Sequence, residues 1–147
     1  MVATPIGNLA DLSLRAIHVL ALVDAIACED TRHSAALLRQ FGLDKPLMAV
    51  HQHNEREAAD AVMLRLARGE RVAYISDAGT PAISDPGAAL VDAVRAGAYR
   101  AIPIPGASSA AAALSVAGDA SGSAFTFIGF LPARGAERAQ ADRKSVV

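Results

Sequence analysis

Residues 72–87 read VAYISDAGTPAISDPG, and this stretch decides the fold class. Its first four residues, 72–75, form an apolar run that is typical of a buried strand in a parallel sheet. The small and polar residues that follow predict a loop whose backbone can approach a ligand closely. A helix is expected to restart at residues 85–87, with Asp85 as its cap and Pro86 in its first turn.

The length of this loop separates two interpretations, a ligand site and an ordinary connection between a strand and a helix. Ordinary connections usually run ~4–6 residues, and this one is longer. In open α/β sheets, ligands bind outside the carboxyl ends of the strands, which is where this loop lies. We therefore expect the loop to form part of a binding site.

Strand and helix patterns alternate along the rest of the chain, as they do in a parallel sheet with crossover helices. Thr31 is an expected helix cap, and Asn54 with Glu57 resembles a capping box. The sequence predicts an α/β fold, with a five-stranded, mostly parallel sheet and helices on both faces. The expected strands are 1–3, 25–28, 47–50, 72–75 and 101–104, and residues 125–130 are expected to form a further, last strand.

Composition narrows the class of protein. The chain has 147 residues, of which 52% are hydrophobic, so one domain with a real core is expected. Its net charge of −1 gives no electrostatic argument for nucleic-acid binding. The single cysteine, Cys28, excludes an internal disulfide and suits a reducing cytoplasm, where we expect it to be a small buried residue of a strand. No apolar run is long enough to span a bilayer.

Polar, Gly or Pro residues fill all five connections that lead from a strand to a helix. In a parallel sheet these connections meet at one edge, whereas the helix-to-strand connections at the other edge are plainer. We therefore expect one edge of the sheet to be the site and the other to be scaffold. The five connections read TPIGN, CEDTR, HQHNE, SDAGTPAISDP and PGASS.

Several ligand classes can be compared from these loops. A phosphate-binding P-loop is absent, and the first loop has only one glycine, which weakens a nicotinamide interpretation even though Glu29 and Asp30 stand near the position of a ribose-binding acid. Backbone N–H groups at Ser108 and Ser109, at a helix start, can hold an anion. His51 and His53 lie two positions apart, but no third ligand at recognisable spacing accompanies them, so no metal site is expected.

Taken together, six blocks of sequence resemble the bacterial small-subunit ribosomal RNA (cytidine-2′-O)-methyltransferases, a family within the tetrapyrrole methylase superfamily. They span nearly the whole chain and follow the order of that family. The blocks are ATPIGNLADLSLRA (3–16), EDTR (29–32), HQHNE (51–55), ISDAGTPAISDPG (75–87), PIPGASSAAAAL (103–114) and FIGFLP (127–132).

The resemblance implies S-adenosylmethionine as methyl donor, the 2′-hydroxyl of a cytidine in 16S rRNA as acceptor, and a cytoplasmic homodimer. It also implies two domains: residues 1–132 match the N-terminal one, and residues 133–147 match a linker or the start of the second. Without that second domain, this chain alone is expected to be inactive. The resemblance implies cofactor binding by Pro5, Ile6, Asp77, Ala78, Gly79, Thr80, Ile83, Ser108 and Ser109, catalysis by Glu29, Asp30, His53 and Asn54, and acceptor binding by Arg32, His51 and Glu55.

The chemistry of methyl transfer fits this division of roles. Displacement at a sulfonium methyl group needs alignment above all, so residues that position the reactants can supply most of the acceleration. A ribose hydroxyl is a poor nucleophile at neutral pH, so a nearby base helps, and Glu29, Asp30 and His53 remain alternative candidates.

Two other functions remain open. The chain could belong to a methylase of small molecules of the tetrapyrrole type, although the EDTR and HQHNE blocks argue against it. It could also act as a non-catalytic binding or dimerisation module.

Overall fold

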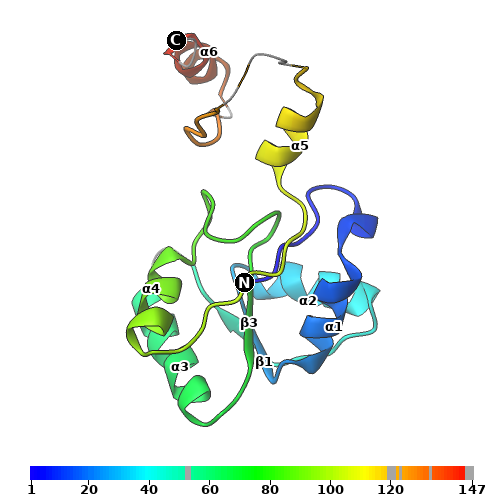
Figure 1. The fold of residues 1–147 in the computed structure, drawn as a ribbon, viewed down its shortest axis with the longest axis vertical. Coiled ribbons are helices and arrows are strands. Elements are labelled where there is room, and N and C mark those ends of the chain that lie inside the picture. The colour runs from blue at the N-terminus through cyan, green and yellow to red at the C-terminus, as the bar shows by residue number, and fades with distance from the viewer. Residues whose placement is uncertain (52–53, 119–121, 123, 133, 145–147) are drawn as a thin grey trace.

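The computed structural model describes residues 1–51, 54–118, 122, 124–132 and 134–144. Figure 1 shows an α/β body with two further helices, α5 and α6, that extend away from it. No helix within these ranges is both long enough and apolar enough to cross a membrane. The elements are a short 3₁₀ turn (Leu9–Asp11), α1 (Leu14–Leu22), β1 (Ala25–Cys28), α2 (Thr31–Gln40), β2 (Leu47–Ala49), α3 (Glu55–Ala67), β3 (Val72–Ile75), α4 (Ala88–Ala96), α5 (Ser109–Val116) and α6 (Gly135–Lys144).

The regular sheet of the described residues has three parallel strands in the order β2-β1-β3, so the prediction of five strands is wrong. Residues 1–3 still lie beside β3, because the Val2 N–H donates to the Tyr74 carbonyl (2.8 Å), and residues 102–104 lie beside residues 1–3, because the Ile104 N–H donates to the Met1 carbonyl (2.8 Å). Val2 and Ile104 form only an isolated parallel bridge. The Ala3 N–H still donates to the Ile104 carbonyl (3.3 Å), but the next N–H, of Thr4, donates to Gly79, so the pairing ends there.

Residues 1–4 also leave the line of β3 early. After Ala3 the chain turns to the long loop, where Thr4 and Gly79 form an antiparallel bridge. Residues 125–130 have no strand assignment, and the side chains of Phe125 and Phe130 are exposed. The expected last strand is therefore absent from this described segment, because no strand pairs with it.

Helix starts differ in detail from the predicted caps. Asp30, one residue before the expected Thr31, caps α2 through a bond from the Arg32 N–H (2.8 Å). Asn54 stands at the N-cap position of α3 but makes no capping bond, so the expected capping box is wrong. The helix expected to begin at Asp85 begins at Ala88. The predicted cap at Asp85 is therefore wrong, because Gly87 occupies the N-cap position.

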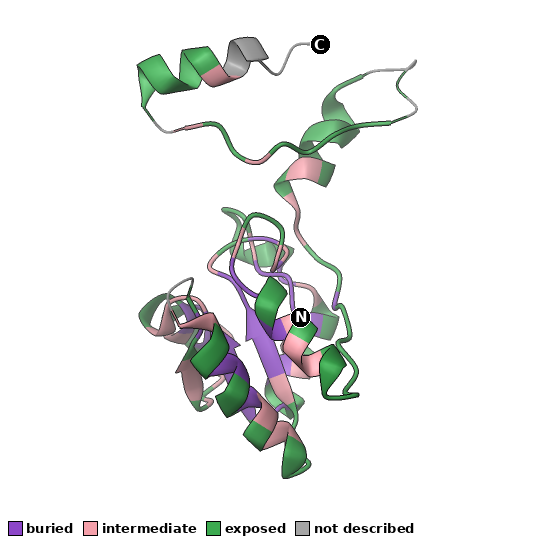
Figure 2. Ribbon diagram, turned by 90° about the vertical axis from the view of Figure 1, so that its left-hand side faces the viewer, coloured by how far each residue is buried: buried purple, intermediate pink, exposed green. Residues whose placement is uncertain are grey.

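The core follows from the alternation of side chains along the strands, because successive residues of a strand point to opposite faces. Ile26 and Cys28 pack on one face with α1 and α2, whereas Ala27 and Tyr74 pack on the other with α3 and α4. Helices thus cover both faces, as predicted, and the buried residues of Figure 2 concentrate in the sheet between them. Cys28 is fully buried, as expected, and this burial raises the pKa of its thiol.

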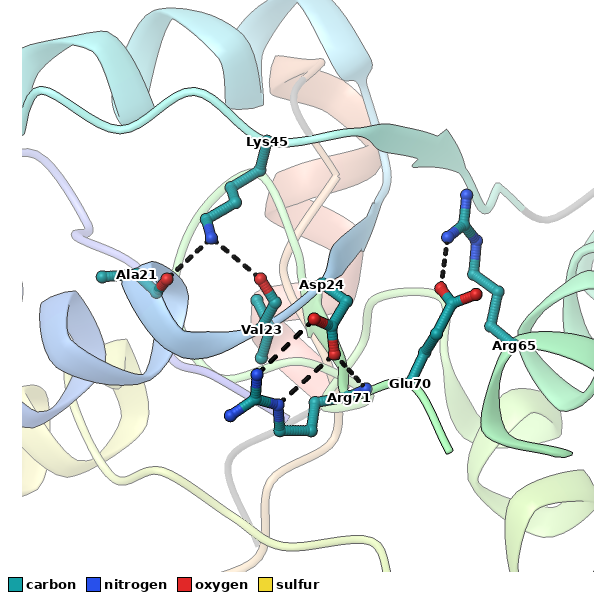
Figure 3. Close-up of polar contacts among 7 residues, drawn as sticks. All are labelled: Ala21, Val23, Asp24, Lys45, Arg65, Glu70 and Arg71. Atoms are coloured by element: carbon teal, nitrogen blue, oxygen red, sulfur yellow. Dashed lines mark hydrogen bonds and ion pairs between the residues drawn. The ribbon is translucent and has the colours of Figure 1, made fainter. Parts of the chain in front are cut away.

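The amino ends of the strands are closed by polar contacts that join the helix-to-strand connections (Figure 3). Lys45 donates to the carbonyls of Ala21 (2.6 Å) and Val23 (2.9 Å) at the end of α1. Asp24 accepts from the backbone N–H of Arg71 (2.7 Å) and also pairs with its guanidinium, and these bonds lower the pKa of the Asp24 carboxyl. These bonds tie the helix-to-strand connections to one another at this edge of the sheet.

Candidate functional site

A cavity of about 380 Å³ lies at the carboxyl ends of the strands. Eight of the nine residues predicted to bind cofactor line it, and Pro5 is the exception. Glu29, predicted to be catalytic, lies in the same wall. The lining residues are Ile6, Glu29, Asp77, Ala78, Gly79, Thr80, Ile83, Asp85, Ser108, Ser109, Ala110, Phe127 and Phe130.

Two threonines hold the first half of the long loop in place. Thr4 and Gly79 exchange backbone hydrogen bonds (2.9 and 3.1 Å), and the Thr4 hydroxyl donates to the Ser76 carbonyl (3.1 Å). The Thr80 hydroxyl donates to the carbonyl of Ala107 (3.1 Å), in the loop before α5. Gly79 has φ +83°, a conformation that glycine adopts without strain. These bonds join three loops that are far apart in the sequence into one wall.

Carboxyl groups gather on one side of the cavity. The backbone N–H of Asp30 donates to the Asp77 carboxylate (3.2 Å), and the backbone N–H of Asp77 donates weakly to the Glu29 carboxylate (3.5 Å). Burial raises the pKa of Glu29, and the negative charges of Asp77 and Asp85 add to this effect. Burial also raises the pKa of Asp85. Glu29 therefore accepts a proton more readily than an ordinary glutamate does.

Asp30 differs from Glu29 in its surroundings. Its carboxylate caps α2 and pairs with the exposed Arg32 (3.4 Å), and the bond from the Arg32 backbone N–H lowers the pKa of Asp30. Neither residue lines the cavity. The structure therefore places Asp30 and Arg32 together at the edge of the site, with Glu29 alone of the EDTR block facing the cavity.

The described residues of the HQHNE block, His51, Asn54 and Glu55, lie just before and at the start of α3 and do not line the cavity. The Asn54 side chain accepts from the His51 N–H (2.8 Å) and donates to the Ala49 carbonyl (3.0 Å), which shapes the turn after β2. The Glu55 carboxylate accepts the N–H of Gly87 (3.1 Å). His53 lies outside the described residues.

Sequence reasoning missed four residues of the cavity wall: Asp85, Ala110, Phe127 and Phe130. Asp85 was interpreted as a helix cap and the two phenylalanines as part of a strand. The rings of Phe127 and Phe130 meet edge to face, with centroids 5.6 Å apart. The sequence does carry a signal for the two phenylalanines, because three of the four phenylalanines of the chain fall within residues 125–130.

Two other kinds of functional site, a second cavity and a metal centre, have less support in the structure. A larger cavity, of about 470 Å³, lies between residues 1–2, β3 and residues 100–104, but mostly apolar side chains line it and the strand-to-helix loops do not reach it. The part of the chain that the structure describes holds no cluster of three or more His, Cys, Asp or Glu residues suited to a metal ion.

The model of one protein family, the tetrapyrrole (corrin/porphyrin) methylases, matches residues 1–146. The chain belongs to this family. Among solved structures, this methylase chain is similar to the uroporphyrin-III-C-methyltransferase of Thermus thermophilus, with a TM-score of 0.57 and 27% identity over 78% of this chain and 49% of the other.

Curated relatives of this methylase chain share a narrower description. The ribosomal RNA small subunit methyltransferase I of Xylella fastidiosa is 56% identical over 134 residues, which are 91% of this chain and 49% of the relative. The protein of the same description from Pseudomonas aeruginosa is 54% identical over 138 residues, which are 94% of this chain and 49% of the relative. The one from Escherichia coli O157:H7 is 48% identical over 141 residues, which are 96% and 49%. The chain therefore spans about half the length of these relatives.

Proposed function

We propose that this chain forms the cofactor-binding half of an S-adenosylmethionine-dependent enzyme that methylates the ribose 2′-hydroxyl of a cytidine in 16S rRNA. One observation carries the proposal: five of the six blocks that resemble this family contribute to a single cavity, with eight predicted cofactor residues and Glu29 in its wall. The curated relatives, at 48–56% identity, are described as small-subunit rRNA methyltransferases.

The cavity suits the cofactor in size, shape and charge. Its volume of about 380 Å³ falls within the range of roughly 300–1,000 Å³ usual for small-molecule sites. Gly79 has φ +83°, where a residue with a β-carbon would be strained, so glycine suits this close turn of the cavity wall. Asp77 and Asp85 supply negative charge, which complements a cationic ligand.

When bound, S-adenosylmethionine supplies a methyl group on a positively charged sulfur. The residues of the loops hold and orient this donor, and alignment accounts for most of the acceleration that the site must provide. Glu29 is the base that we propose for the ribose hydroxyl: its carboxylate lines the cavity and its raised pKa favours the uptake of a proton. Asp30, His53 and Asn54 keep their predicted roles in acceptor positioning or catalysis, as do Arg32 and His51 in acceptor binding.

The relatives are about twice as long as this chain, so we propose that a second domain completes the enzyme. A second domain would complete the cleft around the cofactor, because pockets usually bury ~70–90% of their ligand. Residues 1–132 would then form the first domain, with the linker from residue 133. The enzyme would act as a homodimer in the cytoplasm, on the small ribosomal subunit.

The variant Glu29→Gln tests the proposal in a protein extended to the full length of the relatives. We expect the single-turnover rate on undermethylated small subunits to fall by about 10²–10⁴-fold, as for the loss of a general base. S-Adenosylmethionine affinity, measured by calorimetry, should stay within threefold. The matched control is Glu57→Gln, which removes the same charge from an exposed position of α3. A wild-type rate in Glu29→Gln would remove Glu29 from catalysis.

A second candidate function is methylation of a tetrapyrrole, because the similar solved structure is described as a uroporphyrin methyltransferase. The same full-length protein should methylate small subunits and leave a tetrapyrrole unmodified. The reverse result would favour the small-molecule function. The 147-residue chain alone should methylate neither substrate. If this chain bound a partner and the full-length protein methylated nothing, the interpretation as a non-catalytic binding module would be favoured.

A further inference from the structure

Two side chains from outside the long loop close its far end, at residues 86 and 87. The Tyr74 hydroxyl, from the end of β3, donates to the carbonyl of Pro86 (2.8 Å) in a buried hydrogen bond. The Glu55 carboxylate, from the first turn of α3, accepts the N–H of Gly87 (3.1 Å). The loop is thus fixed at its first half by Thr4 and at its far end by Glu55 and Tyr74.

Close packing reinforces this second attachment. Gly87 is buried and has φ +122°, and a β-carbon there would lie only 2.6 Å from Cε1 of Tyr74. The ring therefore lies directly against the backbone of Gly87, while the Glu55 carboxylate holds its N–H. The side chains of Tyr74 and Glu55 therefore both hold the peptide group between residues 86 and 87.

The segment between the two attachments is strained. Ala82 and Ser84 have φ values of +65° and +61°, in the left-handed region that residues with a β-carbon rarely adopt. Neither conformation persists unless the surroundings hold it. This same segment carries Ile83 and Asp85 into the cavity wall. Their position therefore depends on the attachment at residues 86 and 87.

We propose that Glu55 is a positioning residue of the cofactor cavity, which acts by holding Gly87 and thereby Ile83 and Asp85. This inference rests on the proposed function and deepens it, because Glu55 does not line the cavity itself. The hydrogen bond between Glu55 and Gly87 joins the cofactor loop to the start of α3. It therefore links the proposed cofactor side of the site to the proposed acceptor side.

Three variants separate positioning from a merely electrostatic or structural effect. Glu55→Ala removes the acceptor for the Gly87 N–H, whereas Glu55→Gln keeps an amide oxygen in its place. Glu57→Ala removes an acidic residue from the same helical turn without touching the loop. S-Adenosylmethionine affinity is measured by calorimetry in a protein extended to the full length of the relatives. Hydrogen exchange of the Gly87 amide is measured in the 147-residue chain.

We expect Glu55→Ala to weaken cofactor affinity about tenfold. Glu55→Gln should restore the affinity, and Glu57→Ala should match the wild type. The Gly87 amide should exchange at least tenfold faster in Glu55→Ala, with or without cofactor. Wild-type affinity in Glu55→Ala, or affinity equally weak in Glu55→Gln, would overturn the inference, as would an unchanged Gly87 amide. A wild-type protein that binds no S-adenosylmethionine would instead overturn the proposed function, and the exchange rates would still test the attachment.

Discussion

Replacing Gly87 with alanine inserts a methyl group where the ring of Tyr74 already lies. The new β-carbon would approach Tyr74 Cε1 to 2.6 Å, and the backbone there has φ +122°. Both residues are buried, and the Tyr74 hydroxyl is held by the Pro86 carbonyl, so the ring cannot swing aside without breaking that bond. We therefore expect Gly87→Ala to destabilise the fold through two separate effects.

The size of the loss follows from these effects. Backbone strain at such a φ costs about 1–3 kcal/mol, and forcing a methyl group into a packed site costs about 1–3 kcal/mol more. The expected total is about 2–6 kcal/mol. Gly42 provides the control, because it also has a positive φ, +67°, but nothing lies within 4 Å of its added β-carbon. Gly42→Ala should cost only about 1 kcal/mol, from strain alone.

Thermal melts of the two variants, followed by circular dichroism, measure this difference. For a chain of this size, 1 kcal/mol corresponds to a shift in Tm of roughly 2–4 °C. We expect Gly87→Ala to melt at least about 2 °C below Gly42→Ala. Equal melting temperatures would refute the packing of Tyr74 against Gly87, and with it the grip on the far end of the loop.

Two further predictions concern the two edges of the sheet. Because burial raises the pKa of Glu29 above its unfolded value, the folded state binds this proton more tightly, and the associated stability is present at low pH and is lost as pH rises through the folded pKa. Glu29→Gln should therefore raise the Tm at pH 7 and give no gain near pH 3.5; a lower Tm at pH 7 would contradict the raised pKa. At the opposite edge, Lys45→Met removes the donor to the carbonyls of Ala21 and Val23 and should cost about 1 kcal/mol in urea unfolding, whereas an unchanged midpoint would show that water replaces the ammonium at no cost.

Sequence reasoning succeeded where one local pattern dominates. The apolar runs of β1 and β3 give their bounds directly, because strands buried on both faces need no polar residue. It failed where the outcome depends on neighbours in space. Residues 101–104 have the composition of a strand, but their pairing ends where Thr4 turns away to bond Gly79. Asp30 and Thr31 are both good caps, so geometry alone decides between them.

The candidate site shows the same division. The meeting of the loops at one edge follows from a parallel topology, and the family blocks indicated which loops matter. Whether Asp85 faces the cavity depends on the dihedral angles of Ala82 and Ser84, which lie between the attachments at Thr4 and Glu55. A sequence pattern carries no information on such angles, so it predicts only a cap at Asp85.

The bond between Thr4 and Gly79 also has a consequence for the order of folding. Ile6 and Phe130 stand near opposite ends of the chain, yet both line the cavity. Pairings between residues far apart in the sequence form slowly, because a long loop must close before any contact stabilises it. On a ribosome that is still translating, β1, α2 and β2 can assemble early, but the cavity must wait until residue 130 has emerged. We therefore expect the ligand-binding edge to mature after the sheet, and a bound cofactor to select only molecules in which the chain as far as residue 130 has folded.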